Sequence, residues 1–71
     1  MTQKEKDMMN LMVWKMARKY LRAEKKNASE EKLDGMFAMM NLVDYMFNVN
    51  FTDLMDAIEK GKSYEEIFGD E

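Results

Sequence analysis

The stretch MFAMMNLVDYMF, residues 36–47, holds four of the chain's ten methionines, two phenylalanines and a single charged residue, Asp44. Its apolar residues recur at helical spacing and cover almost the whole circumference of a helix. The polar residues keep only a narrow strip, formed by Asp34, Asn41, Asp44 and Asn48. Because a helix that is apolar on nearly all sides is normally buried on all sides, the stretch predicts an all-α protein with much apolar surface to cover.

The length and composition around this stretch limit how the surface can be covered. A chain of 71 residues makes one domain, and a single core of this size is only marginally stable. There is no cysteine and no histidine, so disulfides are excluded and the commonest transition-metal ligand is missing. Oligomerisation or unusually good helix packing remains as the source of stability. We expect one helical domain over residues 1–71, without cofactor or metal, that associates as a homodimer.

Capping patterns divide the chain into two long and two short helices. Thr2 and Glu5 have the spacing of a capping box, and Ser63 and Glu66 repeat it near the other end. The helices that we expect in this bundle run from about 3–26, 30–48, 53–60 and 64–68.

Shorter polar segments separate these helices. Asn27 or Ser29 can cap the second helix, Thr52 is expected to cap the third, and Gly61 to end it. Gly35 lies in the first turns of the second helix, where glycine costs about 1 kcal/mol relative to alanine. It therefore indicates either close packing at that point or a weak helix start.

The net charge of −3 conceals two halves of opposite sign. Residues 1–26 carry eight basic and three acidic residues, whereas residues 27–71 carry three basic and eleven acidic residues. Such halves attract each other, either within one chain or between two chains.

The outer side of the first helix is one candidate binding surface. Leu11 and Trp14 fall outside its apolar stripe, on the side that also carries Arg18 and Arg22. Tryptophan and arginine are enriched at interface hot spots, so these four residues are predicted to bind a partner. The alternative is that Trp14 packs beneath the third or fourth helix.

The second helix supplies another candidate surface. The first helix can cover one of its sides, and the short third and fourth helices only part of the other, so apolar area around Met39 and Met46 should remain available for binding. Methionine suits such surfaces because its flexible thioether chain adapts to irregular contacts, although it also serves as core filler.

Carboxylates on the two short helices complete the predicted partner-binding set. Asp53, Asp56, Glu65 and Glu66 all lie at or near helix starts, where the helix dipole already favours acidic residues. We expect no catalytic residue, because without histidine or cysteine no recognisable acid–base or nucleophilic arrangement is present.

Two short resemblances bear on other functions. Residues 48–59 resemble a calcium-binding EF-hand loop, with Asn48, Asn50, Thr52, Asp56 and Glu59 at ligand positions. Asp53 replaces the glycine that the family needs for its turn, which favours ordinary helix capping instead. Residues 57–68, AIEKGKSYEEIF, resemble the turn between the first helices of helix-turn-helix domains, but no recognition helix follows and the surroundings are acidic.

We therefore expect a non-enzymatic protein-binding module. Its size and composition are typical of phage or mobile-element proteins that inhibit a host protein by steric occlusion or acidic mimicry. The alternative is a small nucleic-acid-binding regulator that uses the basic side of the first helix. No apolar run approaches the ~20 residues of a membrane span, so we expect a cytoplasmic protein without membrane partners. The basic side of the first helix, on which the nucleic-acid alternative depends, consists of Lys15, Arg18, Lys19, Arg22, Lys25 and Lys26.

Overall fold

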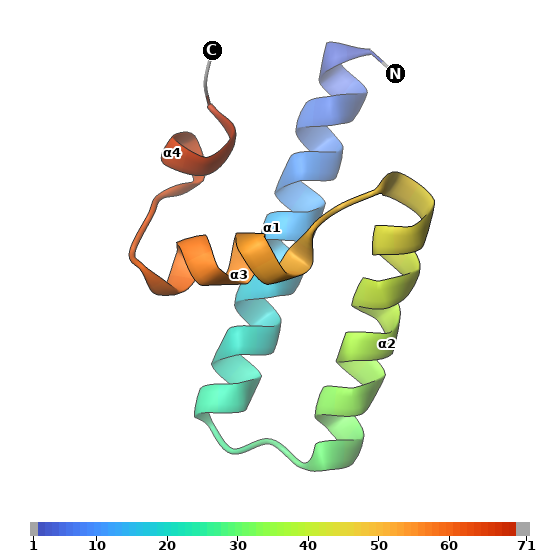
Figure 1. Cartoon of the computed structure of the whole chain (residues 1–71), viewed down its shortest axis with the longest axis vertical. Coiled ribbons are helices and arrows are strands. Elements are labelled where there is room, and N and C mark those ends of the chain that lie inside the picture. The colour runs from blue at the N-terminus through green and yellow to red at the C-terminus, as the bar shows by residue number, and fades with distance from the viewer. Residues whose placement is uncertain (1, 70–71) are drawn as a thin grey trace.

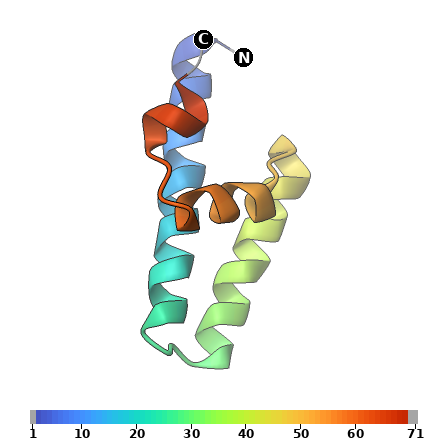
Figure 2. The same cartoon turned by 60° about the vertical axis from the view of Figure 1, so that its left-hand side comes forward.

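The computed structural model describes residues 2–69 and places four α-helices there (Figure 1). Their bounds are α1, Gln3–Lys25; α2, Glu30–Phe47; α3, Phe51–Glu59; and α4, Tyr64–Phe68. α1 and α2 form an antiparallel hairpin, and α3 crosses one side of it (Figures 1 and 2). α4 then returns along the N-terminal half of α1. The predicted all-α class is confirmed.

Both predicted capping boxes are present and begin their helices as expected. The Thr2 hydroxyl accepts a hydrogen bond from the Glu5 backbone N–H at 3.1 Å, and the Thr2 N–H donates to Glu5 Oε1 at 2.8 Å. At α4, the Ser63 hydroxyl accepts from the Glu66 N–H at 3.2 Å, and the Ser63 N–H donates to Glu66 Oε1 at 2.8 Å. These reciprocal bonds satisfy backbone donors that have no partner within the helix.

The start of α3 differs from the prediction, because Asn50 rather than Thr52 caps this helix. The Asn50 side-chain oxygen accepts a hydrogen bond from the Asp53 N–H at 3.1 Å. Asn48 ends α2 in the left-handed conformation, with φ 57° and ψ 50°, which asparagine tolerates better than most residues. The earlier start brings Phe51 into the helix, where its side chain joins the core.

Of the two predicted N-caps for α2, Ser29 is the one in place. Its hydroxyl accepts a hydrogen bond from the Lys32 N–H at 3.2 Å. Close packing at Gly35 is not found, because a Cβ built on this residue meets nothing within 4 Å. Gly35 is therefore a weak point in the first turns of α2, and Gly61, with φ 86°, follows the end of α3.

The core lies where α3 crosses the hairpin. It contains five buried residues: Val13, Ala17, Met40, Phe51 and Leu54. α1 contributes the small side chains of Val13 and Ala17, which let α3 approach closely. α2 contributes only Met40, although it is the most apolar of the long helices.

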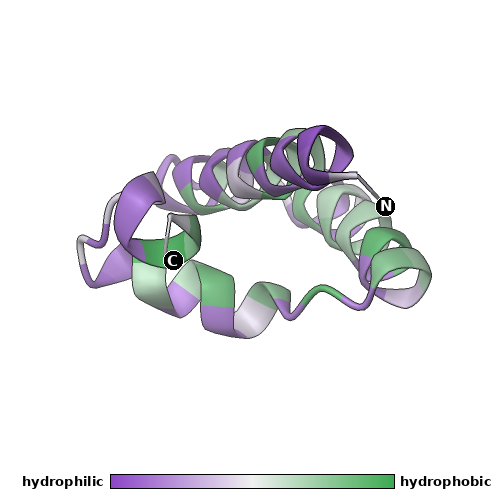
Figure 3. Ribbon diagram, turned by 90° about the horizontal axis from the view of Figure 1, so that it is seen from above, coloured by the Kyte–Doolittle hydropathy of each residue, from purple (hydrophilic) through white to green (hydrophobic). Residues whose placement is uncertain are grey.

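The molecule is more open than a compact monomer of its size. The radius of gyration is 12.5 Å, whereas about 11 Å is typical of 71 residues. The accessible surface of 5584 Å² exceeds by roughly 900 Å² the area expected for a monomer of this mass. Viewed from above in Figure 3, apolar residues extend around most of α2, whereas the outer side of α1 is hydrophilic.

Candidate protein-binding surface

Four exposed large apolar side chains lie together on the side of α2 that faces away from the core. We call Met39, Leu42, Tyr45 and Met46 the α2 outer face. Their spacing puts them on one side of the helix, and the exposed fraction rises from 58% for Leu42 to 89% for Tyr45. Met40, on the opposite side, is 2% exposed. Exposed apolar residues grouped in this way mark an interaction surface.

Two of the predicted partner-binding residues, Met39 and Met46, lie on this face. Leu42 and Tyr45 belong with them but were not among the predicted binding residues. The signal that could have found them is the helical spacing, which already places all four on the same side of the second helix.

Trp14 lies differently from its predicted neighbours on α1. Its ring packs edge-on against Tyr64 of α4, with ring centroids 5.3 Å apart, and its Nε1 is buried without a hydrogen-bond partner. The Arg18 guanidinium covers the ring at 4.7 Å. This placement agrees with the alternative in which Trp14 packs beneath a short helix. Leu11 and Arg22 are exposed, so the structure does not gather the four residues into one apolar patch.

The predicted acidic residues are all exposed, but three of them already make local interactions. Asp53 accepts a hydrogen bond from the Asn50 amide at 3.0 Å, and Asp56 pairs with Lys60 at 3.0 Å. Glu66 belongs to the α4 capping box, whereas Glu65 faces solvent. Three of the four carboxylates therefore already have a local role in the helix that carries them.

Two capping glutamates have perturbed acidities. The backbone hydrogen bond from Thr2 lowers the pKa of Glu5, and the corresponding bond from Ser63 lowers the pKa of Glu66. The side-chain hydrogen bonds of Thr2 and Ser63 act in the same direction. Both carboxylates are fully exposed, so these shifts report helix capping rather than an active site.

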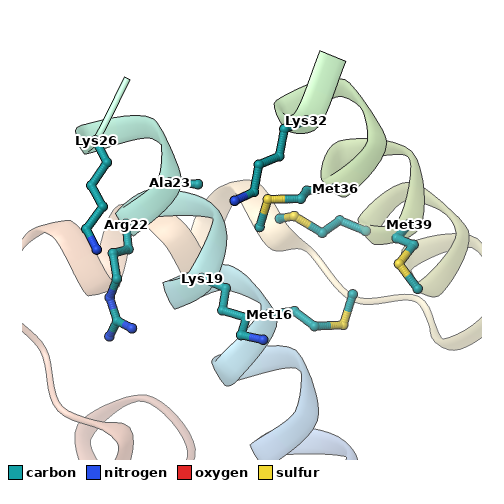
Figure 4. Close-up of a pocket in the computed structure, with 9 residues that line it drawn as sticks. Met16, Lys19, Arg22, Ala23, Lys26, Lys32, Met36 and Met39 are labelled. Atoms are coloured by element: carbon teal, nitrogen blue, oxygen red, sulfur yellow. The ribbon is translucent and has the colours of Figure 1, made fainter. Parts of the chain in front are cut away.

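A groove runs between α1 and α2 near the end of the hairpin where the two helices are joined (Figure 4). We call it the α1–α2 groove; its volume is about 570 Å³. Methionines from both helices make its apolar part, and basic residues make its rim. The lining residues are Met16, Lys19, Arg22, Ala23, Lys26, Lys32, Met36, Met39 and Met40.

The basic residues of the groove have no acidic partner within residues 2–69. The one ion pair in that part of the chain joins Lys60 and Asp56, far along the sequence on α3. Lys19, Arg22, Lys26 and Lys32 are exposed, and no carboxylate is among the residues that line the groove. Their charge is therefore available to an external ligand.

The calcium pattern is not realised as a loop, since α3 begins at Phe51 and runs through most of it. Among the described residues, no three acidic side chains converge as a metal site. None of the helices over residues 2–69 combines the length and the apolar character that crossing a membrane requires.

Comparison of the chain with protein-family models, with curated proteins and with solved structures gives no match. The functional argument therefore depends on the surfaces described above.

Proposed function

We propose that this protein binds other proteins non-covalently, and that two copies associate through the α2 outer face. The observation that supports this is the exposure of four large apolar side chains on one side of α2. The surplus accessible surface, roughly 900 Å², is close to the ~800 Å² that each partner contributes to a standard interface.

The shape of the face suits a symmetric dimer. In a twofold interface the same patch is used by both copies, so four apolar residues per copy bring eight to the contact. Tyr45 and the two methionines supply the kinds of side chain that are enriched in interfaces. Association would cover the side of α2 that its own chain leaves open.

The mechanism that follows is steric. A preformed helical surface that docks on a target covers the target's working site, as expected of a small phage or mobile-element inhibitor of a host protein. Because Asp53, Asp56 and Glu66 already make local interactions, the apolar face rather than acidic mimicry is the main support for this proposal.

The test is the solution mass measured by light scattering behind a sizing column at several concentrations. We expect the wild-type protein to elute at twice the 8.5 kDa of one chain, and Leu42→Glu to elute as a monomer. Asn41→Glu is the matched control, because it adds the same charge on the same helix but outside the α2 outer face. A wild-type protein that stays monomeric up to about 1 mM, with no effect of Leu42→Glu, contradicts self-association.

Nucleic-acid binding is the second candidate, and the exposed cations of α1 favour it. Six of them lie between Lys15 and Lys26, and no ion pair within residues 2–69 neutralises them. Trp14 offers no base-stacking platform, because Tyr64 and Arg18 cover it. If the candidate is right, binding of a single-stranded oligonucleotide will weaken steeply as salt is raised; no binding at low salt rules it out.

A further inference from the structure

We infer that the α1–α2 groove binds an acidic amphipathic helix of a partner protein. In this complex the apolar side of the partner helix lies on the methionines of the groove, and its carboxylates pair with Lys19, Arg22, Lys26 and Lys32. This inference names the partner's chemistry; it shares with the proposed function the assumption that the ligand is a protein and one residue, Met39, at the border of the α2 outer face.

The interior of the groove provides the apolar contacts. Met16 of α1 and Met36 of α2 point toward the space between the helices, and Met39 lies at the edge of this space (Figure 4). Thioether side chains adapt to ligands of irregular shape, and methionine-rich grooves are used by proteins that capture amphipathic helices. The volume of about 570 Å³ is enough for several side chains of a docked helix.

The length of the groove matches a short helix. The lining residues from Met16 to the C-cap residue Lys26 are ten positions apart along α1, which is about 15 Å at 1.5 Å per residue. A helical ligand presents anchors at i, i+3 or i+4 and i+7, which together cover about 10 Å. The groove can therefore hold two to three turns of such a helix.

The charges of the rim determine which helix fits. Lys19, Arg22 and Lys26 have the spacing i, i+3, i+7, which places them in one row along α1. Lys32 extends from α2 on the opposite rim (Figure 4). The groove therefore has a row of cations on its α1 rim and one cation on its α2 rim. This arrangement complements a partner helix that carries carboxylates on both flanks of its apolar stripe. A ligand with one terminal acid group, such as a fatty acid, would use only one end of this row.

A second copy of the chain does not provide such a helix. α3 carries Asp53 and Asp56, but its apolar side, with Phe51 and Leu54, is buried in its own core. In α2 three of the four carboxylates lie in the first turns, at Glu30, Glu31 and Asp34, and α4 is only five residues long. α1 carries more basic than acidic residues, so the groove would repel it. The ligand is therefore expected to come from a different protein.

The experiment measures binding of a dye-labelled synthetic helix by fluorescence anisotropy. The probe is an acetylated and amidated peptide of roughly 14 residues, with leucines at i, i+3, i+4 and i+7, glutamates on both flanks and alanines elsewhere. We expect saturable binding that weakens as salt is raised. A peptide in which lysine replaces every glutamate should bind at least about tenfold more weakly.

Paired variants locate the site. Lys19→Glu combined with Arg22→Glu should weaken binding of the acidic peptide at least about tenfold. Lys15→Glu combined with Lys25→Glu changes the net charge equally but outside the groove, and should leave binding within about threefold of wild type. Circular dichroism of all variants checks that the helices are intact. Equal losses for the two pairs would show a general charge effect and overturn the inference.

Three other results would also overturn it. The first is no binding of the acidic peptide up to about 1 mM. The second is that raising the concentration of the unlabelled Leu42→Glu protein releases the labelled peptide from the groove. This result would show that a second copy occupies the groove. The third is tighter binding of a single-stranded oligonucleotide with the same sensitivity to Lys19→Glu and Arg22→Glu. A failed peptide test leaves the dimer measurement unaffected, because that measurement depends on Leu42, which does not line the groove.

Discussion

α2 and α3 are about equally apolar but are buried to different extents, so the position of a helix decides how much of it is buried. α2 has 18 residues and contributes one, Met40, to the buried core, whereas α3 has nine and contributes Phe51 and Leu54. The difference is that α3 crosses the hairpin with one side against α1, while α2 has a neighbour on only part of its circumference. The more apolar of the two long helices is therefore also the one most available for binding.

The sharpest way to break this comparison is to truncate a leucine on each helix. Leu54→Ala on α3 should lower the free energy of unfolding by about 3 kcal/mol, because Leu54 is 7% exposed and its removal leaves a cavity. Leu42→Ala on α2 should cost under about 0.5 kcal/mol in a monomer, because that side chain faces solvent. Urea denaturation followed by circular dichroism measures both values.

A chain of this size has a total stability of only ~4–10 kcal/mol, so the Leu54 variant should be visibly closer to unfolding at room temperature. If Leu54→Ala and Leu42→Ala lower the free energy of unfolding by similar amounts, the contrast between a buried α3 and an open α2 does not hold for the protein in solution. Similar losses would mean that Leu42 is covered in solution, and a cost for Leu42→Ala that grows with protein concentration would identify a second copy as the cover.

Substitutions of Trp14 test the covered side of the hairpin, where α4 packs on α1. Trp14→Ala should destabilise the protein by roughly 2–3 kcal/mol, since it removes the contact with Tyr64 that holds α4. Trp14→Phe should cost far less, because it keeps a ring there and removes an N–H that is buried without a partner. Thermal unfolding compares the two, and equal losses would show that the indole nitrogen has a partner in solution.

A smaller effect is expected at Gly35, on the open side. Gly35→Ala should raise the free energy of unfolding by about 0.5–1 kcal/mol, because the added Cβ meets nothing and alanine restricts the unfolded chain. Gly61→Ala is the control: its backbone has φ 86°, so the same substitution should destabilise. A destabilising effect at Gly35 would indicate a helix packed closely against α2 there.

The smallest expected effect concerns the helix caps and pH. The pKa of Glu66 is lowered by the hydrogen bonds from Ser63, so the folded carboxylate holds its proton more weakly than the unfolded one. The capping contribution is therefore fully present above the ordinary glutamate pKa and is lost as pH falls through the lower folded value. Carboxyl carbon shifts in an NMR titration should show a depressed midpoint for Glu66, and Ser63→Ala should move it upward. An unchanged midpoint in that variant would contradict the role of the hydroxyl.

Local chemistry made much of the fold predictable. The two capping boxes place the first residues of α1 and α4 as predicted, because each depends only on residues three apart. The start of α3 was predicted two residues late, since Asn50 and Thr52 can both cap and the choice between them depends on burying Phe51. That choice is a tertiary effect, which spacing alone does not reveal.

The candidate site was less predictable for the same reason. Helical spacing placed Met39 and Met46 on a second apolar side of α2, but it could not tell which side α3 would approach. Trp14 looked like a surface residue from its position on α1, and only the return of α4 covers it. The α1–α2 groove depends on how two helices pair, so its basic rim could be predicted only as a charged side of the first helix.

Exposed methionines give this surface a chemical weakness that the buried core does not share. Peroxide converts a thioether to a sulfoxide, which is polar, and it attacks accessible sulfur first. Met39 and Met46, at 65% and 63% exposure, should therefore oxidise long before Met40 at 2%. Oxidised protein would keep its helices but lose the apolar character of its binding face, and methionine sulfoxide reductase would restore it. Binding could thus be switched off by an oxidant while the fold remains intact.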